Sequence, residues 1–510
     1  MNWFVTIGGI AYNIVIIVVC TAFIIYRRRK KASNQEDFLF GGKRMGWFAC
    51  AASIALTALG GGHINGLAYQ SWHTGVATIF YCFGAGLCIV LQMRYVAVWY
   101  RRSGCNSVNE LFGKMFDPAL VPVLSGFGVG YCWLILCVET QGLATVISSM
   151  TGLSNLAGGI IGIIIAFFYV AIAGVEEVGL VNSVNAVLMY VFGFIALVAI
   201  GIYCGGGWEA INGNIMQNNP ELLHALGNPD IIRGYVIGTF LSLAFGMVYI
   251  QPNNQAAASV DDLRILRKAG IGAVIMNVMF GCIILSIGLA SKGMFDMGLL
   301  PQMADLPAPA QNGATAIVFM IMFHLPNWLQ ICIIGMFLAA MLSTVSMVSL
   351  SIALMVNKDI LNYFRRFANP TPAQENFRSR VLVAISMATA AFAAVAIQEA
   401  TNTTITWGFS WFIPLFFMFI IGMNWKRSKV AAWVTILACW VMNMILTFTP
   451  LAAMLNLEGN NHSIFLCVIS IVLGVIITAC DAKAKPKFTS VYAKQRAKFD
   501  AEHGRSAVAR

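Results

Sequence analysis

Long apolar runs follow one another along almost the whole chain, separated by short polar segments. Each run holds roughly 18–30 residues, enough for a helix to cross a hydrocarbon core ~30 Å thick. The ~10-residue alternating segments of a transmembrane barrel are not seen. The pattern predicts an all-α fold with about thirteen membrane-spanning helices, at residues 3–26, 46–71, 76–99, 119–149, 156–175, 183–204, 233–257, 269–291, 326–356, 381–398, 404–423, 430–449 and 464–480.

The segments outside these spans are short. Residues 313–325 are apolar but too short to span a membrane, and we interpret them as an interfacial or outer-loop helix. The first span lacks a preceding basic segment and is too long for a signal peptide, so we expect it to be retained. No soluble domain is expected, because the longest other segments are residues 205–232, 292–325 and 482–510.

Composition and charge agree with a membrane protein. Hydrophobic residues make up 59% of the chain and charged residues 10%, far from the average of soluble domains. If the segment after the first span is cytoplasmic, all but two of the 32 Lys and Arg residues, Arg233 and Lys292, lie on the cytoplasmic side. The positive-inside rule then predicts an inner (plasma) membrane protein with its N-terminus outside and its C-terminus in the cytoplasm. The net charge of +11 thus orients the protein in the lipid bilayer and does not indicate nucleic-acid binding.

Sequence motifs of enzymes are absent. The chain has no HExxH, no compact His/Asp/Cys cluster and no glycine-rich phosphate loop. Its 13 cysteines lie mostly in apolar runs, without metal-ligand spacing. We therefore predict a protein that is not an enzyme and has no cofactor.

The second span carries three consecutive glycines followed by His63. Glycines in the middle of a membrane favour an interrupted helix, whose freed carbonyls can coordinate a cation and whose freed N–H groups can meet a solute. Close packing of helices through small residues is the alternative interpretation. His63 either contacts the solute or bonds a carbonyl.

The ninth span carries adjacent hydroxyls at Ser343 and Thr344. With the preceding carbonyls they can offer oxygen ligands to a hard cation, although Ser and Thr often bond their own helix. Thr57 lies ~16 Å and Ser343 ~20 Å from the cytoplasmic end of its span, at 1.5 Å per residue. Both positions are therefore near the middle of the bilayer and can face each other.

Two further spans contain polar groups. In the seventh span, residues 246–255 include Pro252 and several amides, which predict either a second interrupted helix or an early end of the span. The fourth span carries Glu139 and Gln141. A carboxylate inside a membrane binds a cationic solute, relays a proton, pairs internally or lines a water-filled vestibule.

Taken in order, these motifs resemble the sodium:solute symporter family. The likeness rests on DFLFGGKRMGW at residues 37–47, on the spacing from Ser53 to Gly75, on Gln251 and Gln255, and on AAMLSTVSMVSLSIALMVNKDI at residues 339–360. It covers residues 35–425. The family has the LeuT-type fold, so the resemblance implies a five-plus-five inverted repeat with one N-terminal and two C-terminal additional helices.

The resemblance also implies boundaries along the chain. These are an N-terminal helix with a basic loop, a first repeat, an outer loop, a second repeat, two additional helices and a basic tail, at residues 1–45, 46–204, 205–232, 233–424, 425–481 and 482–510. We expect the tail to be a short helix or disordered.

The resemblance implies a sodium site and a solute site. Sodium would be held by the carbonyls of Leu56, Leu59 and Ala340 and by the hydroxyls of Ser343 and Thr344. The solute would lie beside the glycines, between the second, fourth, seventh and eleventh spans. The candidates for solute binding are Gly60, Gly62, His63, Glu139, Gln141, Tyr249 and Gln251, followed by Trp407 and Trp411.

Three positions depart from the family's pattern. Ala58 stands where many members have an acidic or amide residue, Val181-Asn182 replaces Thr-Asp, and Ala256 replaces Arg. The missing carboxylate at Asn182 removes a negative charge that would help to hold a cation. A proton-coupled or uncoupled carrier, with Glu139 or His63 as the titrating group, therefore stays open.

These observations predict a secondary active transporter that works by alternating access. We expect sodium-coupled symport of a small polar organic solute, namely an amino acid, an amine or a carboxylate. A membrane-embedded solute sensor is the weaker alternative. The expected partners are the solute, sodium and the lipid bilayer, with no obligate protein partner.

Overall fold

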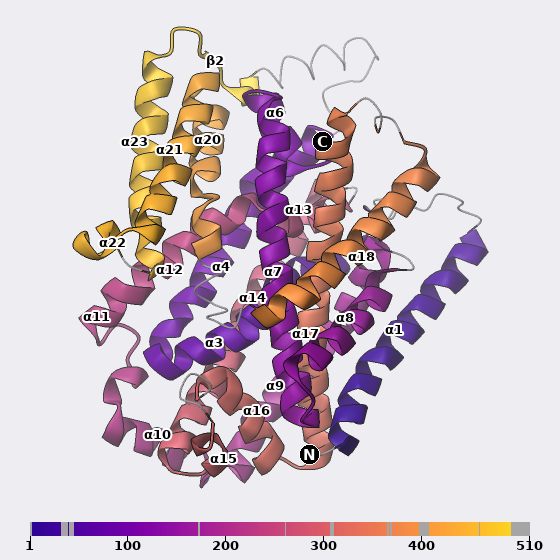
Figure 1. The fold of residues 1–510 in the computed structure, drawn as a ribbon, viewed down its shortest axis with the longest axis vertical. Coiled ribbons are helices and arrows are strands. Elements are labelled where there is room, and N and C mark those ends of the chain that lie inside the picture. The colour runs from indigo at the N-terminus through magenta and orange to yellow at the C-terminus, as the bar shows by residue number, and fades with distance from the viewer. Residues whose placement is uncertain are drawn as a thin grey trace.

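Helices form nearly all of the regular structure in the computed structural model (Figure 1). The structure describes residues 3–31, 39, 45–171, 174–260, 262–306, 311–364, 367, 370–396, 407–457 and 459–490. Most of the expected basic tail therefore lies outside the described residues.

The predicted interruption of the second span is present. Helix α2 ends at Ala58 and α3 begins at Gly61, so Leu59 and Gly60 form the break. A second break follows Thr74, where Gly75 has a φ of 58° and approaches the backbone of Leu222. The helices of this half are α2 (Trp47–Ala58), α3 (Gly61–Thr74), α4 (Ile79–Leu91), α5 (Ala97–Arg102), α6 (Val108–Met115), α7 (Leu120–Thr151), α8 (Asn155–Ala171) and α9 (Val175–Tyr203).

The seventh span is also interrupted, as one of the two interpretations predicts. Its helical part passes through two π-helical turns and ends at Tyr249, and Ile250 is extended. Pro252 then lies in the first turn of the next helix, where a missing N–H costs nothing. The main helices of this half are α11 (Pro229–Ile231), α12 (Ile237–Leu241), α13 (Gln251–Ala258), α14 (Leu263–Asp296), α17 (Asn327–Leu354), α18 (Pro372–Ala396) and α20 (Ile413–Asn424).

Helix α17 is the central element of the bundle (Figure 1). In its most apolar stretch 89% of the residues are buried, whereas the share is 33% in the corresponding stretches of the outer helices α1 (Trp3–Lys31) and α23 (His462–Cys480). Helix α1 lies on one side of the bundle, and α20, α21 (Lys429–Phe448) and α23 lie on the opposite side. The outer helices therefore leave large apolar faces for lipid.

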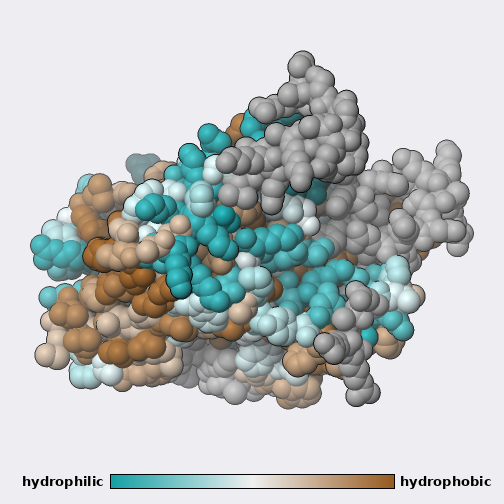
Figure 2. All heavy atoms as spheres, turned by 90° about the horizontal axis from the view of Figure 1, so that it is seen from above, coloured by the Kyte–Doolittle hydropathy of each residue, from teal (hydrophilic) through white to brown (hydrophobic). Residues whose placement is uncertain are grey.

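Short elements cover the two ends. Helices α10 (Gly207–Asn218), α15 (Pro301–Ala304) and α16 (Gly313–His324) lie at one end, which makes the predicted loop 205–232 partly helical. At the other end, near α6, β1 (Lys426–Arg427) pairs antiparallel with β2 (Lys485–Pro486). Seen from that end, hydrophilic residues form a band across the face and hydrophobic residues lie on its flank (Figure 2). The two-residue ladder is a small exception to the predicted all-α fold.

Each of the thirteen predicted spans overlaps a helix. Among the described residues, eleven helices are long and apolar enough to cross a membrane. The shorter apolar helices are Trp47–Ala58, Asn155–Phe168 and Gly313–His324, so the count of thirteen stays a prediction. The boundary at 175–183 is wrong, because the turn at Gly174, with a φ of 61°, starts α9 already at Val175. The repeat boundaries stay predictions.

Candidate ion and solute site

The break after α2 brings its last carbonyls to a hydroxyl of α17. A helix end leaves its final carbonyls without partners from the next turn. The Oγ1 atom of Thr344 donates to the main-chain oxygen of Leu56 at 3.1 Å, and it lies 3.3 Å from that of Thr57 and 3.5 Å from that of Ala340. The N–H of Leu59 also donates to the oxygen of Leu56, at 3.1 Å. The structure thus joins Leu56, Ala340 and Thr344 into one oxygen cluster.

Ser343 lies beside this cluster in the sequence and is fully buried. Its Oγ atom has no hydrogen-bond partner among the described residues. Leaving a buried hydroxyl unpaired costs ~1–3 kcal/mol. The Ser343 oxygen is therefore available as a ligand, unlike those of Ser346 and Ser349, which donate to carbonyls of their own helix.

Glu139 reaches the same break from α7. A Cβ atom built on Gly60 would lie 2.4 Å from Thr344 Oγ1 and 2.5 and 2.6 Å from the two carboxylate oxygens of Glu139. The Glu139 residue is 2% exposed. Only glycine leaves room for these three oxygens, which explains why this position of the break has no side chain.

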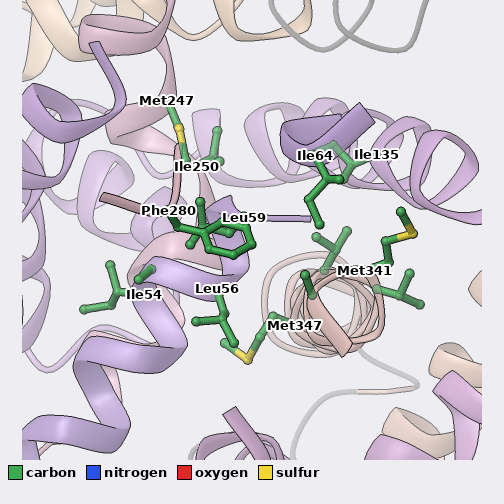
Figure 3. Close-up of a cluster of buried hydrophobic side chains, with 14 of the residues drawn as sticks. Ile54, Leu56, Leu59, Ile64, Ile135, Met247, Ile250, Phe280, Met341 and Met347 are labelled. Atoms are coloured by element: carbon green, nitrogen blue, oxygen red, sulfur yellow. The ribbon is translucent and has the colours of Figure 1, made fainter. Parts of the chain in front are cut away.

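A small cavity opens between the two interrupted helices. Its volume is about 40 Å³, room for a few water molecules. Apolar side chains, among them Leu59, Ile135 and Met341, surround the region (Figure 3). The cavity is lined by Thr57, Ala58, Gly60, His63, Tyr81, Ala85, Ile135, Glu139, Leu243, Met247, Ile250, Pro252, Asn253, Thr344, Val348 and Phe409.

Some polar atoms of residues in the cavity wall have no hydrogen-bond partner among the described residues. Both amide atoms of Asn253 and the Nε2 atom of His63 are buried and have no hydrogen-bond partner among the described residues. The His63 ring also packs edge-to-face on Tyr81, with centroids 4.9 Å apart. These atoms can donate to and accept from a polar solute at low desolvation cost.

Four predicted candidates lie in this cavity wall, namely Gly60, His63, Glu139 and Thr344. Tyr249 and Gln251 do not line it. They hold the start of α6, because Tyr249 Oη donates to the Val108 oxygen at 2.8 Å and Gln251 Oε1 accepts from the Val108 N–H at 2.9 Å. Both are therefore engaged in packing the seventh span against α6.

Gln141 and the two tryptophans also lie outside the cavity lining. Gly62 lies in the first turn of α3, and Gln141 is half-buried on α7. Trp407 Nε1 donates to Thr447 on α21 at 2.8 Å, and Trp411 is buried in an aromatic cluster. Trp407 therefore belongs to the contact between the eleventh span and the additional helices, and Trp411 also packs against Phe127 of α7.

Three polar or aromatic lining residues were missed by the sequence analysis. Asn253 lies in the amide-rich stretch that was singled out, two positions after Gln251, so its residue type was a usable signal. Tyr81 and Phe409 are ordinary aromatic residues in apolar spans, and nothing in the sequence marks them.

Two of the three departures from the family pattern lie close to the site. Ala58 lines the cavity. Asn182 is fully buried, and its Nδ2 atom lies 3.5 Å from Ser53 Oγ, one turn before Thr57. Both positions are neutral, so neither supplies a negative charge to a cation.

A second buried polar network ties the end of the ninth span to α6 and α7. Asp359 Oδ1 accepts from Ser107 Oγ at 2.8 Å, and its Oδ2 accepts from Ser125 Oγ at 2.6 Å. Asn109 Nδ2 donates to Ser125 Oγ at 2.9 Å. Ser107 also caps α6 by accepting from the Glu110 N–H. This network fixes the loop between the third and fourth spans against α17.

Known proteins are similar to this chain over most of its length. A model of the sodium:solute symporter family matches residues 38–438. The sodium/glucose cotransporter of Vibrio parahaemolyticus is 20% identical over 487 residues, which cover 88% of this chain and 86% of that protein. The osmoregulated proline transporter OpuE of Bacillus subtilis is 24% identical over 422 residues, covering 77% and 79%.

Solved structures are similar in fold. The substrate-bound outward-open state of a Na⁺-coupled sialic acid symporter is 18% identical and has a TM-score of 0.76, covering 95% of this chain and 99% of that one. MhsT in complex with L-phenylalanine is 17% identical, with a TM-score of 0.50, and covers 84% and 97%. These likenesses confirm the predicted fold class.

Proposed function

The chain belongs to the sodium:solute symporter family, whose activity is the sodium-coupled symport of a small solute, and we propose that it carries out this activity through the site at the α2–α3 break. The membership confirms the family that the sequence resembles. The relatives are transporters, which is consistent with a protein that is not an enzyme.

Sodium binds at the oxygen cluster in this proposal. The ligands are the carbonyls of Leu56, Leu59 and Ala340 and the hydroxyls of Ser343 and Thr344. The observation that carries the assignment is the approach of Thr344 Oγ1 to the Leu56 oxygen at 3.1 Å, across the two halves of the chain. A cation that binds oxygens from both halves of the chain favours the conformation in which the two halves are docked.

The solute binds in the adjoining cavity. His63 and Asn253 offer polar atoms that the protein leaves unpaired, and Gly60 exposes main-chain atoms at the break. A cavity of about 40 Å³ is too small for an organic solute, so the interrupted helices must move to admit one. Relatives named for glucose and proline support a small polar organic solute as the class.

In this proposal, the interruptions of the second span after α2 and of the seventh span at Ile250 allow alternating access. Sodium binding stabilises one arrangement of the interrupted helices, solute binding closes the outer side, and release occurs to the cytoplasm. The protein lies in the inner (plasma) membrane, with the N-terminus outside and the C-terminus in the cytoplasm. The distribution of Lys and Arg supports this orientation.

The test is the thermal stability of the purified protein when sodium replaces potassium at constant ionic strength. Sodium at 100 times its dissociation constant adds ~2.7 kcal/mol to the free energy of unfolding. We expect this shift in the wild type and its loss in Ser343→Ala/Thr344→Ala. The matched control is Ser349→Ala/Thr140→Ala, whose hydroxyls bond only their own helices. A wild type without a sodium-specific shift would contradict sodium coupling.

A further inference from the structure

The candidate site contains one acidic side chain, and it does not come from the helices that carry the sodium ligands. Of the described residues that line the cavity, Glu139 is the only Asp, Glu, Lys or Arg. It lies in the middle of α7, a helix without a break, and is 2% exposed. An ionised carboxylate at this depth is very costly unless a cation compensates its charge.

The position of this carboxylate is set by the α2–α3 break. Both oxygens of Glu139 and the hydroxyl oxygen of Thr344 lie 2.4–2.6 Å from the point where a side chain of Gly60 would begin. This geometry keeps the carboxylate within ~5 Å of Thr344 Oγ1. One cation that binds oxygen at the ~2.4 Å typical of hard ions bridges such a distance.

The surroundings favour an inorganic cation over the ammonium group of a solute. The atoms that meet at the break are oxygens, from the Glu139 carboxylate, the Thr344 hydroxyl and the Leu56 carbonyl. Hard cations take oxygen ligands of this kind.

We propose that Glu139 is the charged ligand of the coupling-ion site, so that the negative charge for the ion comes from α7. This inference rests on the proposed function. One carboxylate and one monovalent cation leave the site neutral, whereas a divalent cation would leave an excess positive charge in an apolar surrounding. The neutral residues Ala58 and Asn182 are then compatible with sodium binding, because Glu139 carries the charge that they lack.

The experiment is a sodium titration followed by thermal shift and by ²²Na⁺ binding, with potassium as the balancing ion. We expect Glu139→Gln to raise the half-saturating sodium concentration at least tenfold. Glu139→Asp keeps the charge but shortens the side chain, and we expect a smaller increase. Glu209→Gln, an exposed carboxylate on α10, is the matched control and should match the wild type.

The outcomes separate this inference from the proposed function. A wild type that binds no sodium removes both. A wild type that binds sodium, with Glu139→Gln within twofold of it, overturns the role of Glu139 and leaves the proposed function intact. If Glu139→Gln does not fold, Glu139→Asp decides: sodium affinity equal to the wild type at this changed distance contradicts direct ligation.

Discussion

The hydroxyl of Thr344 on α17 donates a hydrogen bond of 3.1 Å to the main-chain oxygen of Leu56, although the two residues are 288 positions apart. This contact exists because α2 stops at Ala58 and leaves the Leu56 carbonyl accessible to another helix. The proposed ion site is therefore shared between the two halves of the chain. A substitution that disrupts this site is expected to weaken both sodium binding and the docking of the two halves.

Thr344→Val tests the hydroxyl at nearly constant volume. We expect sodium affinity to fall about tenfold, and stability without sodium to fall by ~1 kcal/mol for the lost hydrogen bond. Sodium-dependent thermal shift measures both effects. Thr140→Val, whose hydroxyl donates to Leu136 in its own helix, should leave sodium affinity unchanged. Equal effects of the two substitutions would contradict a role for Thr344 in ion binding.

Gly60→Ala tests the shared space at the break. The added methyl carbon would lie 2.4–2.6 Å from the oxygens of Thr344 and Glu139, so these side chains must move away from each other. We expect sodium binding to be lost while the protein still folds, as measured by ²²Na⁺ binding and by size-exclusion chromatography. Gly130→Ala is the control, because a Cβ there meets no atom within 4 Å. Normal sodium binding by Gly60→Ala would be inconsistent with the proposed site.

Tyr249→Phe distinguishes a structural role from a solute-binding role. The phenol donates to the Val108 oxygen at 2.8 Å, away from the cavity lining. We expect the variant to lose ~1 kcal/mol of stability, because the hydrogen bond to the Val108 oxygen is lost. Solute transport assays should show an unchanged half-saturating solute concentration. A large rise in that concentration, with stability preserved, would return Tyr249 to the solute site.

Asp359→Asn tests the network that joins α6, α7 and the end of the ninth span. An intramolecular hydrogen bond contributes ~0.5–1.5 kcal/mol, and both Ser107 and Ser125 donate to the carboxyl group of Asp359. We expect a large fall in melting temperature in the absence of sodium and solute. Asp305→Asn, an exposed position, should have almost no effect. A melting temperature equal to the control would mean that the network adds nothing to stability.

The ion pair between Asp117 and Lys429 predicts an acid-sensitive contact before α7. Burial alone would raise the pKa of Asp117, but hydrogen bonds from Lys429 and Trp433 outweigh it and hold the pKa below its usual value. A carboxyl group whose pKa is lowered by folding stabilises the protein at pH values above its unfolded pKa of ~3.9. This stabilisation is lost as the pH falls through the pKa of the folded state. The melting-temperature difference between wild type and Asp117→Asn should therefore be constant near neutral pH and shrink below about pH 4. Lys429→Gln should reduce this difference at neutral pH, and a difference independent of pH would contradict the assignment.

The sequence predicted the elements that depend on local chemistry. The glycines at 60–62 predict a break because glycine destabilises a helix, and Pro252 with its neighbouring amides predicts another. The similar depths of Thr57 and Ser343 in their spans allowed the second and ninth spans to face each other there, and the resemblance to the family supplied their pairing. These features need no knowledge of how the helices turn about their axes.

The side chains that line the cavity depend on helix rotation, which the sequence does not determine. Tyr249 and Gln251 face α6, whereas Asn253, two positions after Gln251 in α13, lines the cavity. Trp407 points to the additional helix α21 for the same reason, and Trp411 packs against Phe127 of α7 and Trp440 of α21. Along an apolar helix without a polar face, no pattern reveals which side meets the solute.

Because position 60 is a glycine, the evolution of this site is constrained. The carboxylate of Glu139 and the hydroxyl of Thr344 occupy the space beside Gly60, so a larger residue at position 60 displaces both at once. Single substitutions at these three positions are therefore expected to be mutually conditional. A lineage that acquires a side chain at position 60 should also have replaced Glu139 and Thr344, and with them its dependence on sodium.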